Sequence, residues 1–520
     1  MERVVGKETM KAWEKRLISE IGIPSLLLME QAAMGLADVL EDRLADRANP
    51  RILFLSGCGN NGADVLAAAR FLSGRMKQAQ LTLLIARPED TGTEEYRLQR
   101  TIDQNLGIPE ALFTEEVKEK IRNGYYDCYV DGLAGIGFGG ALSGDSLDIV
   151  REVNRAPGIK IAADIPTGVL SDSGAVKGEA FRADETVAFG FRKLGNCLYP
   201  GRNYSGMVTV VPLSGGKEDF FGKLWMTGGK SAGREALVLE PQDLKRFLPV
   251  RREWSNKGSY GKVLLVAGSK DMAGAAAFAA RAALLAGCGL VRILTPEVNR
   301  VALHTLVPEA VLSVYEKEEE ALQLLSEQSK WADALIIGPG LGLSDTAKAL
   351  LKATLTGPKL PLLIDGDALT LLSRDPACMK LLRDRDMPAL LTPHLGEMSR
   401  LAGKTVEALQ DDLFGEAGLL SESLNAICLC KDAVSVLAAP DGRRVLNESG
   451  CNGMATAGAG DVLAGLAGAL MALIPDIFQA AALAALLHGL AGRQAALLKG
   501  NRSMTAVDIL EGIPEVLKTC

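Results

Sequence analysis

Short apolar runs alternate with stretches of helical spacing along most of the 520-residue chain. In the first half, apolar runs at 51–56, 81–86, 128–131 and 159–164 each end near Gly, Pro or Asp. Short strands of this kind, with helical patterns between them, predict a parallel sheet covered by helices. Ligands of such sheets bind beyond the carboxyl ends of the strands, which is where the polar clusters of this sequence fall.

The pattern breaks between residues 212 and 259, where glycines and charges occur without a sustained period. We place a domain boundary there, near residue 225. The alternation then resumes, with strands predicted at 262–268, 290–295, 334–338, 360–365 and 389–392. The sequence therefore predicts two α/β domains in tandem, at residues 1–220 and 236–520, because the chain is too long for one ordinary core.

Composition narrows the classes of function. Hydrophobic residues make up 48% of the chain and charged residues 23%, as in globular proteins. The net charge of −7 argues against a nucleic-acid-binding surface. Backbone N–H groups could still hold a small phosphorylated ligand. Only three histidines are present, which disfavours a His-based metal site.

No targeting segment is apparent. The first ten residues contain no apolar run, and no stretch reaches about 18 uninterrupted apolar residues. The Ala-rich segment 480–498 comes closest, but His488, Arg493 and Gln494 interrupt it, which predicts a buried helix. The nine cysteines lack CxxC pairs and suit a reduced compartment. We expect a cytoplasmic protein that has no membrane partner.

The strongest functional signal is segment 453–465, in which small residues run into Asp461 and then into an apolar helix. Small side chains let several backbone N–H groups converge at a helix N-terminus, where they can hold a transferring phosphoryl group. Asp461 would lie within reach of that group and could accept a proton from an attacking hydroxyl. The alternative is a glycine-rich turn in which Asp461 only caps a helix.

Polar sets at 338–342, 365–369 and 392–397 each follow a predicted strand. Together with segments 257–263 and 268–275, these motifs resemble the ADP/ATP-dependent NAD(P)H-hydrate dehydratase family, a branch of the ribokinase-like fold, over roughly residues 239–518. The resemblance implies phosphorylation of the ring hydroxyl of a hydrated nicotinamide by ADP or ATP with Mg²⁺. Elimination of the phosphate then restores the dihydronicotinamide.

The resemblance also implies roles for individual residues. Asp461 would be the catalytic base. The hydrate would contact Ala275, Gly340, His394 and Asp461. The adenine nucleotide would contact Lys431, Asp432, Ala433, Val434, Ser435 and Gly460.

Several of these residues have plainer alternatives. His394 could be an ordinary surface-loop histidine, and Lys431 a solvated charge. The family usually has Lys-Gly-Ala, whereas this chain has an Asp, Asp432, between Lys431 and Ala433. An Asp carboxylate repels a nearby phosphate unless it points away. Asp365 and Glu397 could orient Mg²⁺ or water, or could be helix caps.

In the first half, the glycine-rich turn 57–64 follows a predicted strand and precedes a helix expected to begin near Val65. It lacks the G-x-G-x-x-G spacing, so a standard dinucleotide site is disfavoured. A second glycine loop occupies 130–140, and a polar set occupies 164–168. Taken alone, all three could be ordinary strand-to-helix turns.

With segments 22–30, 183–193 and 199–201, these turns resemble the NAD(P)H-hydrate epimerase family, which has a Rossmann-like three-layer fold, over roughly residues 1–215. Fusion of the two domains is a known arrangement, so each resemblance supports the other. The implied hydrate contacts are Asn60, Asn61, Gly62, Ala63, Asp64, Gly135, Ile136, Gly137, Phe138, Gly139, Gly140, Ala141 and Asp164.

The epimerase resemblance further implies a potassium ion held by Asn61, Asp131 and Thr167, whose oxygen atoms suit a hard cation. Thr167 stands where Ser is common in the family. Asp164 is the predicted acid or base of epimerisation. Lys193 is the second candidate, with a phosphate or structural contact as its alternative role.

The chain departs from the family at Ala63 and Val65, where the usual loop has glycines. A left-handed backbone at Ala63 would cost on the order of 1–2 kcal/mol. If the ligand approaches closely there, the methyl group would crowd it. The epimerase could therefore be weakened, although the Asn and Asp side chains of the loop favour retained binding.

The combined prediction is a bifunctional enzyme that epimerises hydrated NADH or NADPH and dehydrates the S form, assembled as a homo-oligomer. Two rivals remain open. One is a ribokinase-like kinase for a vitamin-type alcohol, whose product is a stable phosphate ester. The other is an N-terminal domain that only binds a ligand or mediates assembly.

Overall fold

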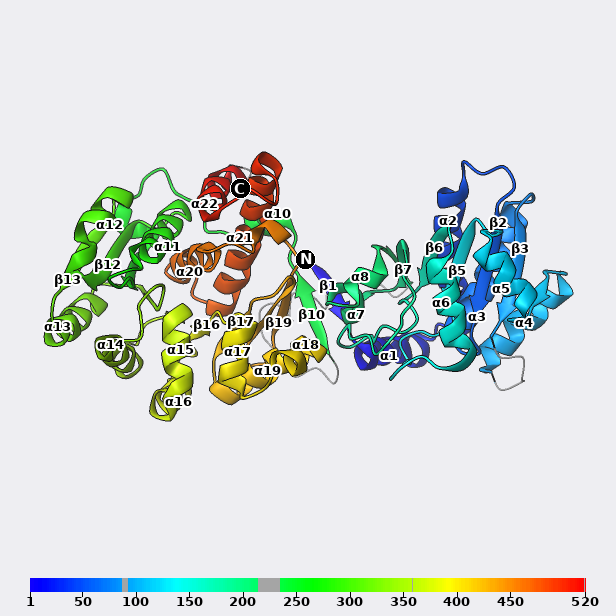
Figure 1. The fold of residues 1–520 in the computed structure, drawn as a ribbon, viewed down its shortest axis with the longest axis horizontal. Helices are drawn as coiled ribbons and strands as arrows, with labels where there is room; N and C mark the ends of the chain where they lie inside the picture. The colour runs from blue at the N-terminus through cyan, green and yellow to red at the C-terminus, as the bar shows by residue number, and fades with distance from the viewer. Residues whose placement is uncertain (87–91, 214–233, 358, 519) are drawn as a thin grey trace. The chain divides into compact units, whose positions relative to one another are not determined.

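The computed structural model describes residues 1–86, 92–213, 234–357, 359–518 and 520. These residues fall into two compact units, each of which is described by itself (Figure 1). The N-terminal unit runs from Arg3 to residue 213 and includes Arg234 and Glu235, whereas the C-terminal unit contains Met1, Glu2 and Ala236–Cys520. The boundary predicted near residue 225, and the domain end predicted at residue 220, lie outside the described residues.

The sheet of the N-terminal unit is parallel throughout, in the order β4-β3-β2-β5-β6-β7-β9. Its strands are β2 (Arg51–Ser56), β3 (Gln80–Ile85), β4 (Glu110–Ala111), β5 (Cys128–Gly132), β6 (Ile159–Ala163), β7 (Glu185–Phe189) and β9 (Met207–Val211). The four strands predicted in this half are confirmed. The strand order reverses between β2 and β5, so the loops after these two strands border a crevice.

Helices cover both faces of this sheet. Alternate residues of β2 point to opposite faces, so Ile52 and Phe54 join one core with α2 (Ser25–Leu44), α3 (Asn60–Arg75) and α4 (Glu94–Asn105). Leu53 and Leu55 join the other core with α5 (Glu115–Arg122) and α6 (Gly144–Arg155). The predicted three-layer α/β fold is therefore confirmed.

A smaller structure lies beyond β7. Strand β1 (Glu2–Val5) pairs in parallel with β8 (Arg192–Lys193), with Val5 opposite Lys193. Four short elements complete the unit: α1 (Lys7–Arg16), the π-helix η1 (Leu17–Ile21), α7 (Leu194–Cys197) and α8 (Arg202–Ser205). The ring of Trp13 in α1 packs edge-on against Phe191, so α1 is fastened beside β8.

The C-terminal unit is built on strands in the order β13-β12-β11-β14-β15-β16-β17-β18-β19-β10. The strands are β10 (Glu235–Val238), β11 (Lys262–Val266), β12 (Leu290–Pro296), β13 (Val311–Tyr315), β14 (Ala334–Ile337), β15 (Leu362–Ile364), β16 (Leu390–Leu391), β17 (Ile427–Cys430), β18 (Ser435–Ala438) and β19 (Arg444–Asn447). The sheet is parallel as far as β17, and β18 is antiparallel to both of its neighbours. The five strands predicted in this half are confirmed.

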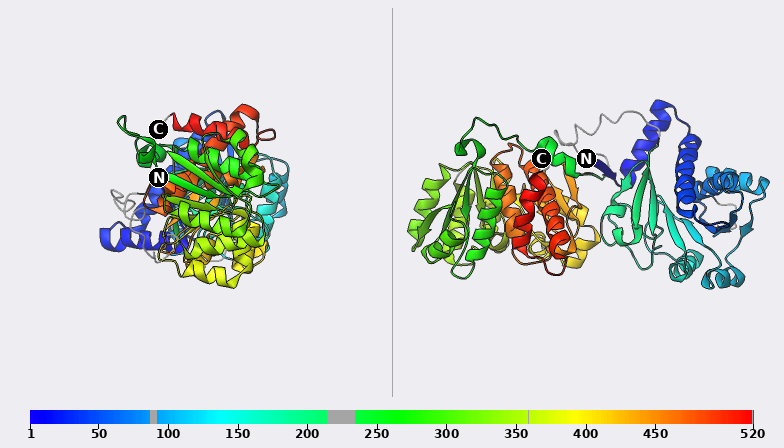
Figure 2. Two further views of the ribbon diagram at one scale, coloured as in Figure 1. Left: turned by 90° about the vertical axis from the view of Figure 1, so that its left-hand side faces the viewer. Right: turned by 90° about the horizontal axis from the view of Figure 1, so that it is seen from above.

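Two groups of helices pack on this sheet (Figure 2). One group is α11 (Ala273–Leu285), α20 (Ala459–Met471), α21 (Ile477–Lys499) and α22 (Ala506–Leu517). The other group is α13 (Glu318–Ser329), α14 (Asp345–Thr356), α15 (Gly366–Arg374), α16 (Pro376–Arg383), α17 (Leu395–Ala402), α18 (Val406–Asp411) and α19 (Leu413–Leu424). Shorter elements are α10 (Pro241–Phe247), η2 (Lys257–Tyr260), η3 (Glu297–Asn299), α12 (Arg300–Leu306) and η4 (Asn452–Met454).

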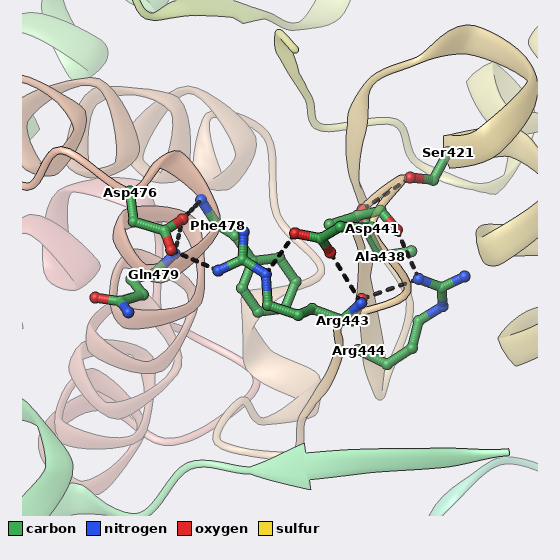
Figure 3. Close-up of polar contacts among 9 residues, drawn as sticks. Ser421, Ala438, Asp441, Arg443, Arg444, Asp476, Phe478 and Gln479 are labelled. Atoms are coloured by element: carbon green, nitrogen blue, oxygen red, sulfur yellow. Dashed lines mark hydrogen bonds and ion pairs between the residues drawn. The ribbon is translucent and has the colours of Figure 1, made fainter. Parts of the chain in front are cut away.

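Helix α21 is the buried helix predicted over 480–498. It is long and apolar enough to cross a membrane, yet 67% of its most apolar window is buried inside the domain. Asp476 caps its N-terminus by accepting a hydrogen bond from the Phe478 backbone at 2.9 Å. Arg443 joins Asp476 to Asp441 and stacks on the Phe478 ring at 4.5 Å, which ties this end of α21 to the β18–β19 hairpin (Figure 3).

Candidate functional sites

Asp461 lies in the first turn of α20. The N-cap of this helix is Gly458, which has a left-handed backbone with φ of 87°, so Asp461 is not the cap. The first-turn N–H groups have no partner within the helix and point toward the side from which an anion would approach. The alternative of a simple Asp cap is therefore wrong, and the Asp461 carboxyl is available beside a helix N-terminus.

Lys431 lies next to this turn. It follows β17, and its Nζ forms an ion pair at 3.0 Å with Oδ1 of Asp365, which follows β15. The hydroxyl of Thr392 donates to the same Asp365 oxygen at 2.6 Å. A methyl group added to Gly460 would come within 3.4 Å of Lys431 Nζ. The Lys431 side chain is only 22% exposed, so the alternative of a solvated surface charge is wrong.

The charges of this site perturb one another. Burial, together with the nearby Asp365 and Asp367 carboxylates, raises the pKa of Asp461 to about 7 against the opposing effect of Lys431. Burial alone would lower the pKa of Lys431, but the nearby carboxylates, Asp365 first, outweigh burial and raise it. Asp461 thus exchanges its proton near neutral pH while Lys431 remains charged, and such a pairing suits a general base beside an anion-binding cation.

His394 and Glu397 form a reciprocal cap on α17. The His394 Nδ1 accepts hydrogen bonds from the backbone of Gly396 at 3.0 Å and of Glu397 at 3.4 Å, and the Glu397 carboxylate accepts from the His394 backbone at 2.9 Å. Burial and the charge of Lys431 lower the pKa of His394, so its imidazole is neutral at pH 7. Its side chain remains 57% exposed, and its Nε2 lies 3.5 Å from the Glu397 Oε1. Glu397 acts as a helix cap, one of the alternatives expected for it.

The other predicted hydrate contacts also meet here. Gly340, in the loop after β14, faces Ala275 in the first turn of α11, because a methyl group on Gly340 would lie 2.8 Å from the Ala275 Cβ. Asp367 accepts a hydrogen bond from the Gly342 backbone at 2.8 Å. The loops after β14 and β15 are thereby fastened together at the ends of neighbouring strands.

The predicted nucleotide segment, 431–435, consists of the turn between β17 and β18 and the first residue of β18. Asp432 and Ala433 are exposed, whereas Val434 is buried and belongs to the core. The Asp432 carboxylate accepts a hydrogen bond from the Ala433 backbone at 2.8 Å. This contact holds the carboxylate against its own turn, which is compatible with a phosphate nearby.

In the N-terminal unit, α3 begins at Asn60, so the prediction of a helix start near Val65 is wrong. Residues 60–64 form the first turns of the helix, because Ala63 donates a backbone hydrogen bond to Gly59 at 3.1 Å. Ala63 therefore has an ordinary helical backbone, and the cost of a left-handed conformation does not arise. Ala63 and Val65 are both fully buried in the core between α3 and the sheet.

Asn61, Asp131 and Thr167 converge from three strand ends. Asp131 accepts hydrogen bonds from the Thr167 backbone and hydroxyl, both at 2.8 Å. The Asn61 Nδ2 donates to the Ala134 carbonyl at 2.9 Å, while its buried Oδ1 has no partner among the described residues. Burial raises the pKa of Asp131 to about 6, against the hydrogen bonds from Thr167 and Leu133. The Asn61 Oδ1, which has no partner among the described residues, and the buried Asp131 carboxylate are suitable ligands for a cation.

Asp164 and Lys193 form a buried ion pair. Asp164 has a left-handed backbone with φ of 66°, uncommon for a residue other than Gly, and its Oδ1 also accepts from the Phe189 backbone at 2.9 Å. The Lys193 side chain is fully buried, and its Nζ additionally donates to the carbonyls of Phe189 at 2.8 Å and Phe191 at 3.0 Å. All three N–H bonds of Lys193 are thus used within the protein, which favours the structural role over catalysis.

Glu14 is a further acidic residue at this site that the sequence reasoning missed. Burial and the Asp164 carboxylate raise the pKa of Glu14, and burial with Asp164 and Glu14 raises the pKa of Asp64 well above its usual value. The carboxyl groups of Glu14, Asp64 and Asp164 therefore all interact with the positive charge of Lys193. A signal was present in the sequence: Glu14 lies among the apolar positions Met10, Trp13 and Leu17 of one helix face.

A cleft opens beside Thr167. It is lined by Gly57, Cys58, Gly59, Ala86, Leu133, Ala134, Phe138, Ala141, Leu142, Ser143, Ser146 and Thr167. The lining unites the turn after β2 with the loop after β5, as expected at the point where the strand order reverses. Of the predicted loop 135–141, Phe138 and Ala141 line this cleft, whereas Ile136 packs against the cluster around Phe191.

Comparison with known proteins agrees with the two-domain architecture. Residues 25–195 match the family model of the YjeF-related protein N-terminus, and residues 263–515 match that of NAD(P)H-hydrate dehydratase. The bifunctional NAD(P)H-hydrate repair enzyme Nnr of Thermofilum pendens is 34% identical over 524 residues, covering 99% of this chain and 96% of the relative. The enzyme of the same name from Moorella thermoacetica is 36% identical, with 96% and 94% covered.

Solved structures similar to the C-terminal unit include an ADP/ATP-dependent NAD(P)H-hydrate dehydratase from Bacillus subtilis, co-crystallised with ATP and Mg²⁺. It is 27% identical, with 56% of this chain and 99% of that chain covered and a TM-score of 0.48. A ribokinase-like superfamily protein from Enterococcus faecalis is 30% identical, with 54% and 95% covered and a TM-score of 0.49.

Two α/β domains, each built on a largely parallel sheet with charged side chains gathered beyond its strand ends, define a two-domain α/β enzyme. From the similarity along nearly its whole length, the chain belongs to the family of bifunctional NAD(P)H-hydrate repair enzymes.

Proposed function

We propose that this protein repairs hydrated nicotinamide nucleotides. The N-terminal domain interconverts the R and S forms of hydrated NADH and NADPH. The C-terminal domain dehydrates the S form with ADP or ATP, releasing AMP or ADP and phosphate. The observation that carries the dehydratase assignment is Asp461, whose pKa is about 7 in the first turn of α20 beside Lys431.

In the dehydratase step, Asp461 accepts the proton of the hydrate hydroxyl while the hydroxyl oxygen attacks the terminal phosphoryl group. The N–H groups of the α20 N-terminus and Lys431 bind the negative charge of that group. The C–O bond of the resulting phosphate ester then breaks, phosphate leaves, and loss of a ring proton restores the dihydronicotinamide. Asp461 thus initiates an elimination, and the ester is an intermediate.

Mg²⁺ would neutralise the nucleotide phosphates during transfer. Among the described residues, no three His, Cys, Asp or Glu side chains gather into a metal site. The Asp365 carboxylate is already bonded to Lys431 and Thr392. The side chains present therefore fit an ion held mainly by phosphates and water, which Asp367 would help to orient while its Oδ2 accepts from the Gly342 backbone.

In the epimerase domain, Asp164 is the proposed acid or base, and burial together with the Asp164 charge raises the pKa of the neighbouring Asp64 carboxyl well above its usual value. Potassium would be held by Asn61, Asp131 and Thr167. Its charge would keep the Asp131 carboxylate ionised, and the ion would be a partner for the Asn61 Oδ1, which has none among the described residues. Lys193 would orient the Asp164 carboxylate through their buried ion pair, while its other N–H groups stay bonded to the Phe189 and Phe191 carbonyls.

A coupled assay on hydrated NADH tests the proposal. Addition of ADP or ATP should restore absorbance at 340 nm and release one phosphate for each NADH formed. A stable phosphate ester without new absorbance would instead identify a ribokinase-like kinase. Conversion of a mixture of both epimers should run to completion at one rate. A halt after half conversion would show that the N-terminal domain only binds ligand or mediates assembly.

We extend the proposal to a cytoplasmic homo-oligomer. The exposed apolar side chains of Val298, Val301 and Leu306, in η3 and α12, support assembly. Light scattering on the purified protein would measure its mass, and a mass of 55.1 kDa, that of one chain, would contradict the oligomer.

A further inference from the structure

Asp365 is a buried carboxylate to which the proposed reaction assigns no direct part. It is only 3% exposed, and it follows β15 as the N-cap residue of α15. Its side chain forms no hydrogen bond with the first turn of that helix, so the alternative of a helix cap is wrong for Asp365. A buried carboxylate is costly unless it is paired and hydrogen-bonded. The partners of Asp365 come instead from the ends of β16 and β17.

Three neighbouring parallel strands bring these groups together. Strands β15, β16 and β17 lie side by side in the sheet. Backbone hydrogen bonds continue just past their ends: Thr392 donates to the Ile364 carbonyl at 3.3 Å, and Lys431 donates to the Pro393 carbonyl at 2.8 Å. The sheet itself therefore sets the backbone positions of Thr392 and Lys431 beside Asp365.

The three side chains converge on one oxygen atom. The Asp365 Oδ1 accepts a hydrogen bond from the Thr392 hydroxyl at 2.6 Å and another from the Lys431 Nζ at 3.0 Å. Thr392 is only 1% exposed, so bulk water does not compete for its hydroxyl. Hydrogen bonds to an ionised group are roughly twice as strong as those between neutral groups. The Lys431 ammonium is thus held by a carboxylate whose own orientation is fixed by Thr392.

The ammonium held in this way faces the turn that opens α20. A methyl group added to Gly460 would lie 3.4 Å from the Lys431 Nζ. Among the described residues, Asp365 is the acceptor for this Nζ, which leaves two of its three N–H bonds for a phosphate. Lys193, in contrast, uses all three within the protein. Because a lysine has a flexible four-carbon stem, its ammonium needs such a partner to stay in one place.

We propose that Asp365 is a positioning residue of the dehydratase: supported by Thr392, it holds the Lys431 ammonium beside Gly460, where the ammonium meets the phosphoryl group during transfer. A cation that is already in place stabilises the developing charge without reorganisation, so the effect falls on kcat more than on nucleotide binding. The inference rests on the proposed dehydratase activity. It assigns Asp365 no contact with Mg²⁺ or with the substrate.

Variants at Thr392, made in the full chain, test the support without altering any charge. Thr392→Val removes the hydroxyl and should lower the dehydratase kcat about tenfold, while the KM for ADP or ATP changes less than about twofold. Thr392→Ser keeps the hydroxyl and should retain kcat within about twofold of the parent.

Ser421→Ala is the matched control in the same domain. It also removes a buried hydroxyl, which donates to the carbonyls of Ala438 at 3.2 Å (Figure 3) and of Ala426 at 2.7 Å. This variant should lower the melting temperature, because two buried carbonyls lose a donor, and leave kcat unchanged. A fall in kcat as large as that of Thr392→Val would show that loss of stability alone explains the effect, and would overturn the proposal.

Asp365→Asn tests the charge. The amide keeps an oxygen for Thr392 but loses the ion pair, so kcat should fall at least about tenfold without a rise in the KM for nucleotide. The charged groups that face Asp461 are Asp365, Lys431 and Asp367, and loss of the Asp365 carboxylate removes one that raises the pKa of Asp461. The fall of kcat/KM at low pH should therefore move to lower pH in Asp365→Asn, but not in Thr392→Val. Recovery of kcat in Asp365→Asn by excess Mg²⁺ would identify a metal ligand instead and overturn the positioning role.

Crystal structures of the two Thr392 variants without nucleotide give a readout that does not depend on activity. In Thr392→Val the Lys431 Nζ should leave its place beside Gly460, whereas in Thr392→Ser it should keep its 3.0 Å contact with Asp365. An unmoved ammonium or a parental kcat in Thr392→Val would refute the proposal. If the unsubstituted protein shows no nucleotide-dependent dehydration, the proposed function fails, while these structures still decide whether Thr392 and Asp365 place the ammonium.

Discussion

Replacement of Asp461 by Asn should abolish dehydration and stabilise the C-terminal domain. Loss of a general base lowers kcat by about 10²–10⁴-fold. The stability gain follows from the pKa, which rises from 3.8 to about 7 on folding. Because the folded state holds the proton more tightly, its stability falls as the pH rises from about 4 to about 7. The cost above pH 7 is up to about 4 kcal/mol, at 1.36 kcal/mol for each pH unit.

Thermal unfolding of the parent and of Asp461→Asn, measured at pH 5 and at pH 8 without nucleotide, would show this linkage. The transition of the C-terminal domain is recognised by its upward shift when nucleotide is added. The Asn variant should melt several degrees above the parent at pH 8, with a smaller gap at pH 5. Epimerase activity should be unchanged. A gap independent of pH, or a kcat within tenfold of the parent, would refute the assigned pKa or the assigned base.

Further substitutions test the remaining assignments. Asn61→Ala should remove the dependence of epimerase activity on potassium, measured against sodium at equal ionic strength. Lys193→Met should destabilise the N-terminal domain by about 3–5 kcal/mol, because it leaves Asp164 buried and unpaired; adding Asp164→Asn should restore its melting temperature but not epimerisation. Ala63→Gly should cost about 1 kcal/mol without raising epimerase kcat, since residue 63 is helical and buried. Asp432→Asn should lower the KM for nucleotide without altering the melting temperature, because one negative charge leaves an exposed turn near the phosphates.

Alternating apolar runs predicted the strands well because parallel strands buried on both faces need continuous apolar side chains, which a single sequence displays. The predicted start of α3 was wrong because apolar patterning does not mark the first turn of a helix. Asn60 to Asp64 are polar and rich in small residues, so their composition indicated a loop. In the fold, this segment supplies a helix N-terminus facing the cleft, where polar side chains and free N–H groups are favourable.

The candidate residues were accessible to sequence reasoning where they follow strands, as Asp365 and Lys431 do, or where a glycine-rich turn leads into a helix, as at Asp461. Glu14 was marked only by its place among the apolar positions of one helix face, and nothing local connects it with Asp164, which lies far along the chain. Burial and long-range charge give Glu14 its chemical character, and neither quantity exists in a local sequence window.

The sequence by itself determined two α/β domains, the strand-end turns that carry the chemistry, and the family to which they belong. Only the tertiary structure decided which charges share a site. It brings Lys431 and Asp365 together beside Gly460. It also brings Lys193, all of whose N–H groups are hydrogen-bonded, together with Asp164 and two further carboxyl groups. The physical reason is that a pKa depends on desolvation and on charges within a few ångströms, which packing brings together from distant parts of the chain. The same packing places Ala63 in the core, where its methyl group adds to the buried apolar surface and causes no backbone strain.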